Sequence, residues 1–158
     1  MSSRILKNLT MLALVVGLAL ATTVVSANGQ STSLVTANIP FDFIVGNKVL
    51  PSGKYAVNSA TSDAQGVSIR NREGKSSPAL VLTLTVPEKS SKRTARMVFH
   101  RYGQQYFLAE IWTGDSYGRK LMASKRERNL RQELASNPSK SDSVKSSYEI
   151  VEVVASLR

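Results

Sequence analysis

The stretch that decides the fold of this chain is TARMVFHRYGQQYFLAEIWT, residues Thr94–Thr113. Before Gly103, apolar and polar side chains alternate, which places Ala95, Met97 and Phe99 on one face. After that glycine, a second run with the same alternation continues to the end of the stretch. A period of two indicates strands, and two such runs across a tight turn predict an antiparallel hairpin.

The same period recurs along most of the chain. We expect further strands over residues 34–45, 54–59, 66–71, 79–86 and 148–155. In the first of these, the residues that share one face are Val35, Ala37, Ile39, Phe41, Phe43 and Val45. Pro40 marks a bend or an edge, because proline cannot donate a ladder hydrogen bond. The run Ala79–Val86 (ALVLTLTV) is the most apolar strand, and we expect it to be central.

Short, evenly spaced strands separated by turn residues favour a mainly β fold. We predict an antiparallel meander of about seven strands that forms a small barrel or an open curved sheet, with one C-terminal helix. The last strand could pair with the first and so close the sheet.

The period changes after residue 120. Ser124 and Glu127 form a capping box, in which the hydroxyl and the carboxylate each satisfy an amide of the first helical turn. A helix should therefore run from Lys125 to about Ser136, with Leu130 and Leu134 resting on the sheet. We place a β domain with this helix over residues 28–136, a flexible linker over 137–147 and a final strand over 148–158.

The N-terminus is typical of a secretory signal. Arg4 and Lys7 precede the uncharged run Leu9–Val25, and small residues end at Ala27. We predict a signal peptide over residues 1–27, a retained anchor being the alternative, and no membrane span in the mature chain. The protein would then be secreted or periplasmic, and removal of the two basic residues would lower its net charge from +10 to +8.

Little in the composition points to catalysis. The chain has no cysteine and a single histidine, His100, which alternation places on the face opposite Phe99. These counts exclude a disulfide scaffold and thiolate zinc sites, and we expect no cofactor and no enzymatic activity.

The glycines at 46 and 53 do not match the Walker spacing for phosphate. Asp42 and Glu110 are carboxylates within strands, and Glu110 should share a face with Tyr106, Leu108 and Trp112.

Basic residues crowd the region around the predicted helix. They are Arg119, Lys120, Lys125, Arg126, Arg128 and Arg131. Such a cluster is either a solvated helix face or a binding surface for an anionic envelope component or a protein partner. Nucleic acid is not expected as the partner, because export removes the chain from it and no RNP-type motif is present.

Three segments resemble a set of short exported proteins common in acidobacteria: ANIPFDFIVGNKVLPSGKYAV (37–57), MVFHRYGQQYFLAEIW (97–112) and GRKLMASKRER (118–128). The resemblance implies a secreted, mostly β domain and brings no activity, cofactor or catalytic residue with it.

These observations lead to three functional hypotheses. The first is a non-enzymatic exported binding or structural protein of the cell envelope that uses the basic cluster. The second is a carrier of a small apolar ligand inside the barrel, with a pocket lined by Phe41, Phe43, Tyr55, Phe99 and Trp112. The third is a hydrolase using Asp42 and Glu110. Across the last two hypotheses, the candidate pocket residues are Asp42, Tyr55, Glu110 and Trp112.

Overall fold

A computed structural model describes residues 33–61, 65–89, 93–136 and 148–157. The predicted signal peptide (1–27) and linker (137–147) lie outside the described residues. Within them, no helix is both long and apolar enough to cross a membrane.

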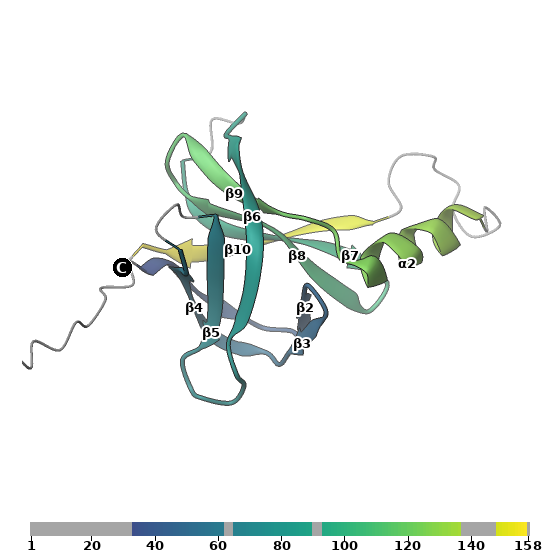
Figure 1. Cartoon of the computed structure of the whole chain (residues 1–158), viewed down its shortest axis with the longest axis horizontal. Helices are drawn as coiled ribbons and strands as arrows, with labels where there is room; N and C mark the ends of the chain where they lie inside the picture. Colours follow the sequence, from purple (N-terminus) through teal and green to yellow (C-terminus); the bar gives the residue numbers. More distant parts are fainter. Residues whose placement is uncertain (1–32, 62–64, 90–92, 137–147, 158) are drawn as a thin grey trace, which may run out of the picture. The chain divides into compact units, whose positions relative to one another are not determined.

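The described chain folds into strands with one helix near the C-terminus (Figure 1). The strands are β1 (Ser33–Ile39), β2 (Phe43–Val45), β3 (Lys48–Leu50), β4 (Gly53–Ser59), β5 (Gly66–Asn71), β6 (Ala79–Pro87), β7 (Ala95–Tyr102), β8 (Gln105–Thr113), β9 (Tyr117–Leu121) and β10 (Glu149–Ser156). The helix is α2 (Lys125–Ser136), whose bounds agree with the prediction.

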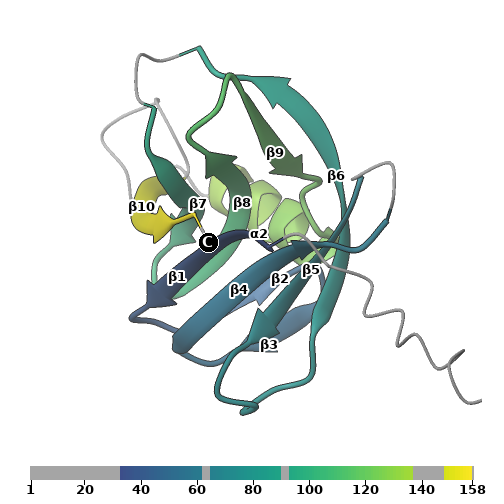
Figure 2. The ribbon, with the colours of Figure 1, turned by 90° about the vertical axis from the view of Figure 1, so that its left-hand side faces the viewer.

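Eight of these strands close an antiparallel barrel (Figure 2). Their order is β1-β4-β5-β6-β9-β8-β7-β10, and β10 returns to β1. The predicted closure by the last strand is confirmed, since Ala37 pairs with Ala155. The predicted fold class, a mainly β barrel with one C-terminal helix, is therefore confirmed, although β9 was not foreseen. Without β9 the barrel would be open, because this strand joins β6 to β8.

The long first strand predicted over 34–45 is in fact two strands, β1 and β2, interrupted at Pro40. The missing N–H of proline explains the break. The chain then forms a hairpin in which Val45 pairs with Lys48 across Gly46-Asn47, and Gly46 has a φ of 60° that glycine adopts without strain. The β2–β3 hairpin joins the barrel by a parallel pairing of Ile44 with Phe107 on β8.

A β-bulge in β8 changes which side chains face the core. Phe99 pairs with Leu108 while Val98 pairs with Glu110, so Ala109 is the additional residue. The prediction that Glu110 shares a face with Tyr106 and Leu108 is therefore wrong. Tyr106 and Leu108 pack in the core, whereas Glu110 lies on the outer face with Trp112, because one inserted residue reverses the alternation.

The barrel interior is filled by aromatic and branched side chains. Phe43, Tyr55 and Phe99 are fully buried, and the Phe43 ring centroid lies 5.0 Å from that of Tyr55 and 5.5 Å from that of Phe99. Phe41 stacks on Tyr106 with 3.9 Å between ring centroids. These contacts form the main core of the protein.

The apolar strand β6 has neighbours on both sides but presents its leucines to solvent. Leu80, Leu82 and Leu84 are 71%, 68% and 57% exposed, while Ala79 and Thr83 point inward and are buried. An apolar run of this kind usually marks a central strand that is buried on both faces. Strand β6 is instead buried on one face only.

Candidate functional site: a basic groove beside helix α2

The start of helix α2 is fixed by the predicted cap. Ser124 Oγ accepts a hydrogen bond of 3.1 Å from the backbone N–H of Glu127, so the serine half of the capping box is confirmed. The glutamate half is different. Glu127 Oε1 lies 2.8 Å from His100 Nδ1 and accepts a 3.3 Å hydrogen bond from the Tyr102 hydroxyl. The carboxylate therefore links the helix to strand β7.

A small second cluster of apolar residues supports this attachment on the outside of the barrel. Leu130 of α2 packs against a cluster formed by Ile44, Tyr102 and Phe107. Burial, followed by the nearby Glu127 carboxylate, raises the pKa of Tyr102 to about 12, so the phenol is neutral at physiological pH. Leu134, which was expected to rest on the sheet, is 46% exposed.

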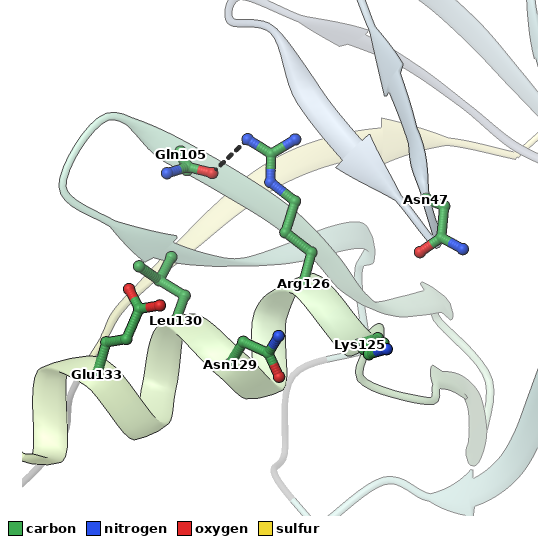
Figure 3. A pocket seen from close by; sticks show the side chains of 7 residues that line it. All are labelled: Asn47, Gln105, Lys125, Arg126, Asn129, Leu130 and Glu133. Atoms are coloured by element: carbon green, nitrogen blue, oxygen red, sulfur yellow. Dashed lines mark hydrogen bonds between the residues drawn. The ribbon is translucent and has the colours of Figure 1, made fainter.

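A groove of about 540 Å³ lies beside the attached helix (Figure 3). The residues that line it are Asn47, Gln105, Lys125, Arg126, Asn129, Leu130 and Glu133. Arg126 extends from the helix toward the β7–β8 hairpin, where its Nη2 donates a 2.7 Å hydrogen bond to Gln105 Oε1. Asn47 approaches from the β2–β3 turn. Three separate parts of the chain thus build one groove.

The groove combines cationic and amide groups. Lys125 and Arg126 supply two positive charges against the single carboxylate of Glu133, and Asn47 and Asn129 supply amide donors. Gln105 occupies one guanidinium nitrogen and orients the remaining N–H groups of Arg126. Such an arrangement suits a carboxylate or phosphate oxygen, which accepts charge-assisted hydrogen bonds from a guanidinium and an ammonium.

Of the six predicted basic residues, two line this groove. Arg119 and Lys120 belong to strand β9, where Arg119 Nη1 donates a 3.5 Å hydrogen bond to Thr85 Oγ1 and Lys120 is exposed. Arg128 Nη1 donates to the carbonyl of Ala123 at 2.8 Å, and Arg131 is exposed on α2.

Sequence reasoning missed Asn47 and Gln105. Neither carries a local signal, because Asn47 reaches the groove only through the pairing of β2 with β8, and Gln105 only through the contact of Arg126 with the β7–β8 hairpin.

Glu110 and Trp112 line a second recess of about 700 Å³ on the outer face of the barrel. Trp112 Nε1 donates a 3.0 Å hydrogen bond to Glu110 Oε2, and the guanidinium carbon of Arg96 lies 4.9 Å from the ring centroid. Arg96 also donates to Glu88 Oε2 at 2.6 Å, with both side chains about one-tenth exposed or less. The tryptophan therefore lies within a structural ion-pair network.

Asp42 and Tyr55, the other two candidate pocket residues, stabilise a turn. Asp42 Oδ1 accepts a 2.8 Å hydrogen bond from the backbone N–H of Ser52, and the Tyr55 hydroxyl donates to the Pro51 carbonyl at 2.6 Å. The four predicted pocket residues thus divide between this turn and the outer recess.

In the parts of the chain that the structure describes, no three histidine, aspartate or glutamate side chains gather in a way that would hold a metal ion. Comparison with protein families, with curated proteins and with solved structures finds no match for this chain.

Proposed function

We propose that this protein is an exported, non-enzymatic binding protein of the cell envelope, and that the groove beside helix α2 binds an anionic envelope component. Export rests on the N-terminal sequence, in which a basic start and an apolar run precede Ala27. The net charge, +10 for the whole chain and +8 without residues 1–27, favours encounters with anionic surfaces in general. The groove supplies the specific contact.

The observation that carries the proposal is the position of Lys125 and Arg126 in the first turn of α2. Cations at a helix N-terminus oppose the helix dipole, whereas the dipole and the free amides there attract an anion. The last turn, where cations would stabilise the helix, contains no basic residue. The acidic residue of the first turn, Glu127, is bonded to His100 and Tyr102, so the two cations beside it are available to bind an anion.

The test compares two charge reversals on the mature protein. Arg126→Glu removes the guanidinium from the groove, and Lys54→Glu makes the same change in net charge at an exposed position on β4. Retention on isolated envelope material, measured at low and high salt, should be salt-dependent, lost in R126E and kept in K54E. Equal losses in both variants would mean that net charge alone acts, and the groove would have no special role.

Neither other hypothesis has a specific observation in its favour. The aromatic rings that were expected to line a ligand pocket contact one another inside the barrel, and Trp112 lies outside it. Asp42 and Glu110 have separate surroundings, the one at a turn and the other beside Trp112.

A further inference from the structure

Large apolar side chains gather on the outer face of the barrel at β6 and β9. Leu80, Leu82 and Leu84 point outward from β6, and each is more than half exposed. Met122 is 67% exposed and follows Leu121, which is buried and pairs with Thr83. The side chain of Met122 therefore lies on the outer face of the barrel, as that of Leu82 does. We refer to Leu80, Leu82, Leu84 and Met122 as the leucine patch.

The leucine patch is not explained by the stability of the fold. Ala79, Val81 and Thr83 take the inward positions of the same strand, so its smaller side chains face the core while its three leucines face outward. Single exposed leucines are common, but a contiguous group on one strand marks a surface that is covered by something else.

The border of the patch carries two lysines. Lys120 on β9 pairs with Leu84 on β6 and with Glu110 on β8, so it lies between the patch and a recess that Glu88, Glu110 and Glu152 help to line. At the other end, Lys48 Nζ donates to the carbonyls of Ser77 and Pro78, which immediately precede β6, and to Ser77 Oγ, so its three N–H groups are bonded within the protein. The apolar centre thus has a lysine at each end.

The patch also adjoins the basic groove. A recess of about 510 Å³ between the β2–β3 turn and the start of β6 is lined by Asn47 and Leu80 among others. Asn47 also lines the groove that contains Lys125 and Arg126. One continuous surface therefore combines four large apolar side chains with the cations of the groove and the two flanking lysines.

We propose that this surface docks on an anionic phospholipid bilayer. The leucine patch would enter the boundary between head groups and acyl chains, while Lys120 and the groove cations contact the head groups. The inference rests on the proposed function and names its anionic component. A bilayer explains both the apolar centre and the adjoining cations of the groove.

The test is flotation of the mature protein with vesicles of phosphatidylcholine alone, and with about 30% phosphatidylglycerol added. The wild type should float with the anionic vesicles only. The double variant Leu82→Gln/Leu84→Gln should lower the partition coefficient about tenfold. Val154→Gln is the matched control, since Val154 is an 80% exposed apolar residue on β10, and it should bind as the wild type does. Circular dichroism confirms that each variant is folded.

Three results would overturn the inference and leave the proposed function standing. In the first, R126E abolishes vesicle binding while the leucine variant binds normally, which means that charge alone acts. In the second, the wild type binds envelope material but no vesicle. In the third, it binds no vesicle and self-associates in sedimentation velocity through the leucines, which means that a second copy covers the patch. Failure to bind either vesicles or envelope material would contradict both proposals.

Discussion

His100 on strand β7 and Glu127 on helix α2 meet with 2.8 Å between Nδ1 and Oε1, although 27 residues separate them in the chain. Glu127 is 5% exposed, the lowest exposure of any residue in the helix. The contact holds the Glu127 side of α2 against the barrel, and the groove with Lys125 and Arg126 lies beside it. The orientation of the groove therefore depends on this pair.

Replacing Glu127 with alanine should destabilise the protein. Its loss leaves His100 and Tyr102 without the carboxylate, and breaking a buried polar pair of this kind costs about 2 kcal/mol. Urea unfolding measures the change. Glu133→Ala, an exposed residue of the same helix, should change the free energy of unfolding by less than about 0.5 kcal/mol. Equal effects of the two substitutions would show that the His100 contact contributes nothing.

Stability should fall between about pH 10 and pH 12 because of Tyr102. Its pKa in the folded protein is raised to about 12, above the ordinary value of 10.0. The neutral phenol is therefore favoured by folding, and its contribution is complete below pH 10 and is lost as the pH rises through 12. A Tyr102→Phe variant should lose less stability than the wild type over this range in urea titrations. If the wild type and Tyr102→Phe lost stability equally over this pH range, Tyr102 would not be the group responsible.

Gly118→Ala should be strongly destabilising. A Cβ atom at this position would overlap the Trp112 ring, so the ring or strand β9 must move, at a cost of about 2 kcal/mol. The double variant Gly118→Ala/Trp112→Leu removes the obstacle. A double-mutant cycle from thermal unfolding should therefore show that alanine costs less in the Trp112→Leu background. Additive effects would mean that the ring does not restrict β9.

Removing one partner of the buried ion pair of Arg96 and Glu88 should destabilise the protein more than removing both partners. Glu88→Gln removes the carboxylate that lies 2.6 Å from the buried guanidinium and leaves the more exposed Glu152, 3.8 Å from Nε, so it should cost about 2 kcal/mol or more. The double variant Arg96→Met/Glu88→Gln removes the charges of both partners and should recover part of that stability. Urea unfolding of the three variants measures this. A double variant less stable than Glu88→Gln would contradict the expectation.

Substitutions on the inner face of the barrel wall should cost more stability than substitutions on its outer face. Phe99→Ala removes a fully buried ring and should cost about 3–5 kcal/mol. Leu82→Gln alters an outward side chain and should change the free energy of unfolding by less than about 0.5 kcal/mol. Thermal unfolding compares the two variants. A large loss in Leu82→Gln would show that the patch serves the fold.

Much of the barrel could be predicted because local alternation determines strands. The hairpin over 94–113 and the helix over 125–136 follow from period and caps, whereas the pairing of the last strand with the first was one possibility that the sequence left open. Strand β9 was missed because its five residues, two of which are basic, carry little apolar signal. The faces of β8 were misassigned because the bulge at Ala109 has no mark in the alternation.

The candidate site was only partly visible for the same reason. Lys125 and Arg126 stand out as charges, but Asn47 and Gln105 reach them through strand pairings. Glu127 looked like a capping residue because its spacing from Ser124 fits a capping box, and a spacing cannot show a partner on another strand.

By itself, the sequence determined the antiparallel strands, the helix start at Lys125 and the basic character of the chain, because these depend on neighbouring residues and on composition. Only the tertiary structure decided which face of β6 is buried, how the barrel closes through β9, and which cations meet beside α2. The physical reason is that alternation divides a strand into two faces without saying which is inside. That choice depends on packing against residues far away in the chain.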